Sequence, residues 1–389
     1  MQLSLVSSAH NLHHTLADNS VVCLMAPTAS GKTALAYELY DTGRYELISV
    51  DSALIYRDMN IGTAKPTAAE LQRYPHHLVN IIDPTQSYNV ADFISDVADL
   101  IERCHQNGKI PLLVGGTMMY YMALLDGLSP VPDSHDSVRE QVEQWRVAEG
   151  ISALYDYLGK IDPISHQRLN ATDTQRITRA VEVYLQTELP LSDWQRQPKQ
   201  ALAHNTKQQW HALAVMPDRA WLHTRIAQRL DMMWDEGLIS EVLALLERYP
   251  LTPNLPSMRC VGYRQVLEYL VQTNHPIFEQ PHLDKAQFFD AFSPINENSD
   301  SQISLNNSPK PTLLSSYSKI EIEALACHQM QNKALYATRQ LAKRQYTWLR
   351  KLTQLPMHQE NTSLSSETLN NKMMIQSFMT MEQAGIYLR

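Results

Sequence analysis

Residues 26–33 read Ala-Pro-Thr-Ala-Ser-Gly-Lys-Thr, the spacing of a loop that binds a chain of phosphates. In such a loop, backbone amides bind phosphate oxygens, the following helix adds positive potential, and Lys32 reaches a terminal phosphate. The hydroxyl of Thr33 is suited to ligate Mg²⁺, which we expect as a cofactor. The usual pattern opens with glycine, so Ala26 must keep a negative φ angle. We predict phosphate binding over a chance Gly-Lys-Thr turn, because an apolar run precedes the loop and a helix former follows it.

Asp51 is the acidic residue best placed to act beside this loop. An enzyme that hydrolyses or transfers the phosphate of a nucleotide needs an acid at the end of a neighbouring strand. The apolar run Ile110–Val114 ends instead in Gly-Gly-Thr, whereas the run Leu47–Val50 ends in Asp51. Asp51 is therefore a candidate general base, although an aspartate in this setting is about as typical of a turn or a helix cap.

Short apolar runs separated by helix-like stretches predict the sheet that must position these residues. The runs are Val21–Met25, Leu47–Val50, Ile110–Val114 and Trp210–Val215, with Leu78–Ile82 as a weaker candidate. Runs of this length between helical stretches are typical of parallel strands. The fold class is therefore α/β, with a parallel sheet core like that of the P-loop NTPases, an all-helical insertion and a helical C-terminal part.

The remaining pattern predicts how the chain is divided. Helical periodicity runs over Asp133–Trp194, over Asp218–Leu246 with a break near Gly237, and over Lys319–Leu352, and a short helix is expected near Met373–Met381. We divide the chain into an N-terminal extension (1–19), a first core part (20–132), a helical insertion (133–200), a second core part (201–292), a Ser- and Asn-rich loop expected to be disordered (293–318), a C-terminal helical segment (319–352) and a tail of unassigned role (353–389).

Composition limits the classes of function. The 389 residues carry a formal net charge of -8, which argues against non-specific coating of nucleic acid, so any RNA contact must come from a local patch. The four cysteines lie far apart without partners at metal-ligand spacing, so we expect neither zinc nor disulfides. No secretion signal or membrane span is expected, and we place the chain in the cytoplasm.

Six stretches, in order along the chain, together resemble the tRNA dimethylallyltransferase family, also called tRNA isopentenyltransferases. They are residues 26–33 (APTASGKT), 49–56 (SVDSALIY) with 61–66 (IGTAKP), 112–121 (LLVGGTMMYY), 173–184 (DTQRITRAVEVY), 256–265 (PSMRCVGYRQ) and 338–350 (TRQLAKRQYTWLR). The resemblance covers most of residues 20–352. The Ser- and Asn-rich stretch around 280–320 and the tail after Leu352 fall outside it.

The resemblance implies transfer of a dimethylallyl group from dimethylallyl diphosphate to N6 of adenosine 37. This nucleotide lies 3′ of the anticodon in tRNAs that read codons beginning with U, and diphosphate is released. The implied catalytic residues are Asp51, which accepts the amine proton, Thr28 and Arg229. The implied diphosphate-binding residues are Ala26, Pro27, Thr28, Ala29, Ser30, Gly31, Lys32, Thr33, Arg225 and Arg229. Of the two arginines, Arg229 matches the family position better.

The resemblance also implies the residues that bind tRNA. They are Asp51, Ser52, Ala53, Leu54, Thr117, Arg139, Gln175, Arg176, Ile177, Thr178, Arg179, Arg259, Cys260, Val261, Gly262, Tyr263, Arg264, Lys343, Arg344, Gln345, Tyr346, Thr347, Trp348, Leu349 and Arg350. In the last segment basic residues alternate with aromatic ones, which fits phosphate contact and base stacking, but the apolar side chains also fit the packed side of a helix. The resemblance thus implies that the helical insertion (133–200) binds tRNA and that the C-terminal helical segment (319–352) contacts it. We expect the anticodon stem-loop as partner, and a monomer.

Three other interpretations stay open. A small-molecule kinase would use the same loop, with Asp51 as base or Mg²⁺ ligand. An adenylate dimethylallyltransferase would act on free AMP or ATP and would have no use for an anticodon-binding insertion. A non-catalytic RNA-binding protein with a degenerate loop would account for Ala26 but not for the retention of Thr28, Lys32 and Asp51.

Overall fold

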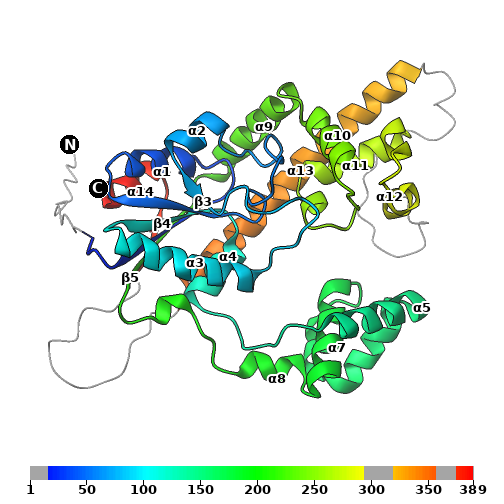
Figure 1. Ribbon diagram of the computed structural model, residues 1–389, viewed down its shortest axis with the longest axis horizontal. Helices are drawn as coiled ribbons and strands as arrows, with labels where there is room; N and C mark the ends of the chain where they lie inside the picture. The colour runs from blue at the N-terminus through cyan, green and yellow to red at the C-terminus, as the bar shows by residue number, and fades with distance from the viewer. Residues whose placement is uncertain (1–15, 293–318, 356–373, 389) are drawn as a thin grey trace, which may run out of the picture. The chain divides into compact units, whose positions relative to one another are not determined.

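A six-stranded parallel sheet forms the centre of the computed structural model, which describes residues 16–292, 319–355 and 374–388 (Figure 1). The strand order is β3-β2-β4-β1-β5-β6. The strands are β1 Ser20–Met25, β2 Tyr45–Val50, β3 His76–His77, β4 Ile110–Gly115, β5 Gln209–Val215 and β6 Met374–Phe378. Every residue of β1 and β4 is buried, as expected for strands covered on both faces. The predicted α/β class with a parallel sheet is confirmed.

Four of the predicted strands are present, whereas the strand predicted at Leu78–Ile82 is wrong. The strand at that edge is His76–His77, which pairs with Leu47 and Ile48 of β2. The chain leaves the sheet directly afterwards, because Leu78 and Asn80 adopt φ angles of 61° and 57°, outside the extended region. Beyond them, an isolated bridge joins Ile82 to Tyr56.

Helices cover both faces of the sheet. Helix α1 (Lys32–Tyr40) follows β1 directly and buries Leu35, Ala36 and Leu39 against the strands. On the other face lies α3 (Val90–Gln106), whose side-chain cap at Asn89 fixes its start. A third helix, α4 (Met118–Leu125), begins just after β4.

A second hydrophobic core forms among the helices that follow β5. These are α9 (Arg219–Asp235), α10 (Leu238–Arg248), α11 (Tyr263–Gln272), α12 (Lys285–Phe292) and α13 (Lys319–Thr353). The predicted break near Gly237 is confirmed, since this residue has a φ of 94° between α9 and α10. The long C-terminal helix is confirmed as α13. Short elements complete the chain: α2 Ala68–Arg73, η1 Leu202–His204, η2 Ser257–Arg259 and η3 Pro276–Glu279.

The end of the chain belongs to the sheet, which corrects the helix expected near Met373–Met381. Strand β6 pairs in parallel with β5 over five residues, and α14 (Met381–Leu388) packs beside α1 (Figure 1). Gly385 lies against Leu35, and the hydroxyl of Tyr45 donates to the carbonyl of Leu388 at 2.9 Å. Five residues are too few for a clear period, so pairing with β5 decides their conformation. The expected loop 293–318 and most of the N-terminal extension lie outside the described residues.

Residues Met122–Asn205 form a compact unit of their own, and the rest of the described chain forms the other. The unit contains α5 (Asp136–Ile161), α6 (Pro163–Arg168), α7 (Thr174–Thr187) and α8 (Leu191–Arg196). Its core is made mainly by α5 and α7, which bury Val142, Leu154, Leu158, Ile177 and Val181. Gly150, with a φ of 82°, interrupts α5. Within the described ranges, no helix is long and apolar enough to span a bilayer.

Candidate active site

A cavity of about 470 Å³ opens in the larger unit at the carboxyl ends of β1, β2 and β4. Ligands of open parallel sheets bind at this edge. Of the residues proposed from the sequence, the cavity brings together Thr28, Ala29, Lys32, Asp51, Ser52, Ala53, Thr117, Arg229, Arg259, Cys260, Val261, Gly262, Arg344, Gln345 and Trp348. Residues of the phosphate loop and of α13, which are more than 300 residues apart in the chain, thus line the same cavity.

The phosphate loop keeps its geometry despite Ala26. This residue is fully buried and has a negative φ angle, so its methyl group causes no backbone strain. Ala29 has a φ of 61° and Gly31 a φ of 91°, and these two left-handed residues curl the loop before α1. The hydroxyl of Ser30 is buried and makes no hydrogen bond within the described chain, so a phosphate oxygen in the loop would satisfy it.

Two partly buried cations and one carboxylate set the electrostatics of the cavity. The pKa of Lys32 is lowered to about 8, mainly by burial; Asp51 opposes this shift, and Arg229 adds to it. Burial also lowers the pKa of Arg229, again against the effect of Asp51. Two desolvated cations with one shared anion are left with unbalanced positive charge. A diphosphate placed between them would compensate it.

Asp51 combines a structural contact with exposure to the cavity. Its Oδ1 accepts hydrogen bonds from the backbone N–H of Ala53 at 2.9 Å and of Leu54 at 3.4 Å, which forms the turn after β2. Asp51 also lines the cavity, and its Oδ2 has no hydrogen-bond partner among the described residues. The turn interpretation is thus correct for one oxygen, and the other oxygen can accept a proton.

Gln345 connects α13 to the phosphate loop through a hydrogen bond. Its Oε1 accepts from the backbone N–H of Thr28 at 3.0 Å, and its Nε2 donates to the carbonyl of Gly116 at 2.8 Å. A Cβ on Gly116 would lie 2.6 Å from that Nε2, so only glycine permits the contact. Both ends of this buried amide are used within the protein. Gln345 therefore connects α13 to the phosphate loop, and its contact with tRNA stays a prediction.

Other predicted residues lie outside the cavity. Arg225 stacks on Trp221 and donates from Nε to the carbonyl of Ala29 at 3.0 Å, so it supports the phosphate loop from outside. Arg264 lies over the ring of Phe292. The remaining members of this group are Ala26, Pro27, Ser30, Gly31, Thr33, Leu54, Tyr263, Lys343, Tyr346, Thr347, Leu349 and Arg350.

Three side chains assigned to tRNA are core residues instead. Ile177 and Leu349 are fully buried, and Tyr346 is buried with its hydroxyl donating to the carbonyl of Pro217. Their side chains pack inside the protein, and a contact of these positions with tRNA stays a prediction. On α13, Lys343, Arg344, Thr347 and Arg350 are exposed, and Lys351 lies 5.3 Å from the ring of Trp348.

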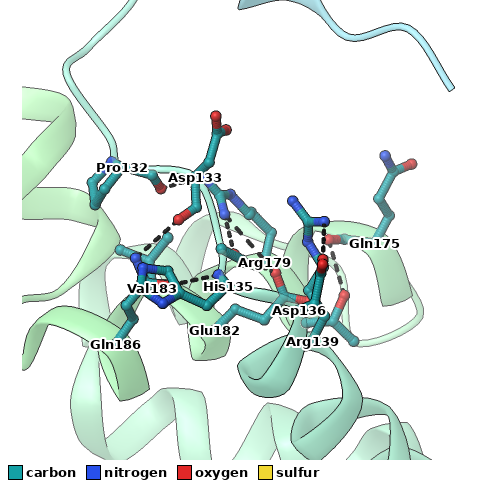
Figure 2. Close-up of polar contacts among 12 residues, drawn as sticks. Pro132, Asp133, His135, Asp136, Arg139, Gln175, Arg179, Glu182, Val183 and Gln186 are labelled. Carbon is teal, nitrogen blue, oxygen red and sulfur yellow. Dashed lines mark hydrogen bonds and ion pairs between the residues drawn. The ribbon is translucent and has the colours of Figure 1, made fainter.

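Figure 2 shows three of the predicted residues of the insertion, Arg139, Gln175 and Arg179. Arg139, Gln175 and Arg176 are exposed, and the two arginines pair with Asp136 of α5 and with Asp173, the N-cap residue of α7. Arg179 instead donates to the hydroxyl of Ser134 and to the carbonyl of Pro132, and pairs with Glu182. Thr178 bonds to the carbonyl of Thr174.

Several cavity residues were not predicted. The cavity face of α9 carries Ile226, Leu230 and Met233 beside Arg229, a three- and four-residue spacing that could have been extended from Arg229. Residues 62–64 line the cavity too; they belong to a stretch that carried the resemblance but was given no role. The others are Gly116, Met118, Met119, Pro256, Thr338 and Leu341.

The fold and the cavity define an α/β protein with a loop of the phosphate-binding type next to a partly apolar space and an acidic side chain. Residues 54–352 match the model of the IPP transferase family, more than half of the chain. The chain therefore belongs to this family.

Curated relatives agree with this assignment. A tRNA dimethylallyltransferase of Psychrobacter cryohalolentis is 71% identical, over 100% of this chain and 98% of the relative. One from Acinetobacter baumannii is 46% identical over 86% and 91%. Among solved structures, the tRNA isopentenylpyrophosphate transferase of Bacillus halodurans matches with a TM-score of 0.51 and 26% identity, over 93% of this chain and 90% of that one. A eukaryotic dimethylallyltransferase acting on tRNA shares the fold, with a TM-score of 0.60 and 21% identity over 85% and 70%.

Proposed function

We propose that this chain transfers the dimethylallyl group of dimethylallyl diphosphate to N6 of adenosine 37 in tRNA. The observation that supports it is the meeting of the phosphate loop, Arg229 and Asp51 in one cavity that also has apolar walls. Its relatives of high identity are named for this reaction. The apolar residues of α9 offer a surface for a five-carbon chain, which phosphoryl transfer does not by itself require.

The reaction needs one bond to break and one to form. The bond between C1 of the dimethylallyl group and the diphosphate oxygen breaks, and the electron pair leaves with the oxygen. Adenine N6 forms the new bond to C1 and gives its proton to Asp51 Oδ2. Lys32, Arg229 and the loop amides stabilise the charge that develops on the leaving diphosphate. Because the N6 lone pair is delocalised, removal of its proton by a positioned carboxylate lowers the barrier.

Thr33 and the diphosphate itself are the groups we propose to hold Mg²⁺. The described residues contain no group of three or more acidic, His or Cys side chains that would form a protein cage for a metal. The hydroxyl of Thr33 is exposed at the start of α1. This donor set suits a Mg²⁺ held mainly by diphosphate oxygens and water, where it would offset charge on the leaving group.

The RNA partner that we propose is the anticodon stem-loop. Arg344 and Trp348 bring charge and an aromatic ring to the cavity, and Arg139 and Arg176 are exposed on the insertion. These groups supply the local positive potential that the net charge of the chain lacks. The target adenosine must leave its stack to reach Asp51.

We further propose a cytoplasmic monomer. The phosphate loop, Asp51 and Arg229, which the proposed reaction uses, all lie on this chain. Strand β4, the neighbour of β1, ends in Gly115 followed by Gly116 and Thr117, so the acid that a kinase needs at this position is missing.

The test is incubation of the purified chain with labelled dimethylallyl diphosphate and an anticodon stem-loop, in parallel with free AMP. We expect labelled N6-(dimethylallyl)adenosine in the stem-loop and diphosphate in equal amount. Prenylation of AMP at a higher kcat/KM than the stem-loop would show that the chain acts as an adenylate dimethylallyltransferase instead. Absence of product with both acceptors, at any Mg²⁺ concentration, would overturn the proposal.

A further inference from the structure

Two loops of the cavity are joined by one carboxylate that does not itself reach the cavity. Residues 62–64 line one part of the space and residues 259–262 another. Glu241, in the first turn of α10, lies behind both loops and is not among the lining residues. Nothing in the chemistry described above uses it.

Glu241 accepts four hydrogen bonds through its two oxygens. Oε2 accepts from the backbone N–H of Asn60 at 3.0 Å and of Ile61 at 2.7 Å. Oε1 accepts from the N–H of Gly62 at 3.2 Å and from the hydroxyl of Tyr263 at 2.5 Å. Three consecutive amides of one loop and the residue that follows the other loop thus share one anion. Hydrogen bonds to an ionised acceptor are stronger than neutral ones.

Close packing accompanies these bonds. A Cβ on Gly62 would lie 2.5 Å from the ring of Tyr263 and 2.7 Å from Leu238, so the loop can approach only as glycine. Tyr263 is fully buried, and burial together with Glu241 raises the pKa of its hydroxyl well above the ordinary value, so it remains a donor. Gly262, which lines the cavity, has a φ of 94° and lies beside Leu238.

A buried lysine holds the same loop from within. Lys65 donates from Nζ to the carbonyl of Tyr56 at 2.5 Å and to Oδ1 of Asn80 at 2.7 Å. Its backbone N–H donates to the carbonyl of Asn60 at 2.9 Å, which closes the loop. Glu241 is close enough to act on the charge of Lys65. The loop is therefore fixed at its base by Lys65 and at its tip by Glu241.

We propose that Glu241 is a positioning residue for the acceptor adenosine, because it sets the distance between the loops 62–64 and 259–262 that flank the cavity. The inference rests on the proposed prenyl transfer. The diphosphate end is built from different elements, the phosphate loop and α9, and within the described part of the chain it makes no hydrogen bond with Glu241. Loss of Glu241 should therefore weaken binding of the acceptor RNA and leave binding of the donor, dimethylallyl diphosphate, unchanged.

The experiment compares E241Q with the wild type and with E247Q, whose side chain is exposed on the same helix. Glutamine keeps the size but offers one acceptor oxygen in place of two and turns an NH₂ towards backbone amides. We expect the KM for the stem-loop to rise about tenfold, while the KM for dimethylallyl diphosphate stays within twofold. Amide hydrogen exchange should accelerate at residues 60–62 and not in the phosphate loop. E247Q should resemble the wild type.

A second variant separates positioning from stability. Y263F removes one of the four donors and keeps the ring that packs on Gly62, so we expect a smaller rise in the same KM. Unchanged acceptor KM in E241Q, or a parallel loss for donor and acceptor with a lowered Tm, would overturn the inference. A wild-type chain that forms no product would instead refute the proposed function, so the two failures are distinguishable.

Discussion

The phosphate loop and the helical insertion each contain a basic motif that stands out in the sequence, but they use it differently. In the loop, the backbone conformation at Ala29 and Gly31 sets the geometry, and Lys32 lies at the cavity as its position in the motif requires. In the insertion, the motif is a set of side chains on α7, and its second arginine, Arg179, is used to hold the segment Pro132–Ser134 (Figure 2). A backbone motif fixes geometry through its own sequence, whereas a side chain on a helix takes its role from whatever packs beside it.

The largest effect should come from Asp51 at the reaction centre. Asp51→Asn keeps Oδ1 as acceptor for the turn amides of Ala53 and Leu54 but removes the proton acceptor, so kcat should fall by roughly 10²- to 10⁴-fold. Donor binding and Tm should change little. Single-turnover rates measure the effect, with Asp231→Asn on the exposed side of α9 as control. Turnover within threefold of the wild type would remove Asp51 from the role of base.

Lys32 should show the next largest effect, confined to the donor. Lys32→Ala removes one of two desolvated cations, so the KM for dimethylallyl diphosphate should rise about 10- to 100-fold, as expected for a charge-assisted contact. The affinity for the stem-loop should not change. Lys109→Ala is the control, because Lys109 donates to the carbonyl of Gly43 and lies outside the cavity. A loss of stem-loop affinity with normal donor binding would contradict the assignment.

The two arginines of the insertion sharpen the comparison further. Arg179→Ala should lower the free energy of unfolding of the insertion by about 1–3 kcal/mol, since it leaves Ser134 and the Pro132 carbonyl without their donor. Arg176→Ala should leave stability unchanged and reduce the dependence of RNA binding on log salt by about one phosphate contact, because Arg176 is exposed. Thermal denaturation and binding at several salt concentrations measure both. A stable Arg179→Ala variant with reduced salt dependence, together with a destabilised Arg176→Ala variant, would show that Arg179 does not have the structural role assigned to it.

The sequence alone predicts those elements whose structure is determined by one contiguous segment of the chain. The strands β1, β2, β4 and β5 are apolar runs, and the phosphate loop is a fixed motif, so both could be predicted. Strands β3 and β6 have two and five residues and depend on pairing with β2 and β5, which no local period reveals. Gln345 and Glu241 act through contacts more than 170 residues away in the chain. Such roles follow from the packing of distant segments and leave no local pattern.

The smallest effect is a change of donor affinity with pH. The pKa of Lys32 is lowered to about 8, so the lysine is charged below this pH and progressively loses its proton above it. The diphosphate prefers the charged form, and its own last ionisation lies lower, so donor affinity should be constant up to about pH 7.5 and fall by less than tenfold by pH 9.

Lys32→Arg separates this effect from other titrations. Arginine stays charged over the whole range, so the fall above pH 8 should disappear even if the affinity itself is lower. Arg229, the other cation that acts on Lys32, keeps its guanidinium charge between pH 7 and 9, so the slope of affinity against pH reports on Lys32. Titration calorimetry with dimethylallyl diphosphate at fixed ionic strength measures it. An affinity that rises with pH, or a fall that persists in Lys32→Arg, would show that the donor is not held by the charge of Lys32.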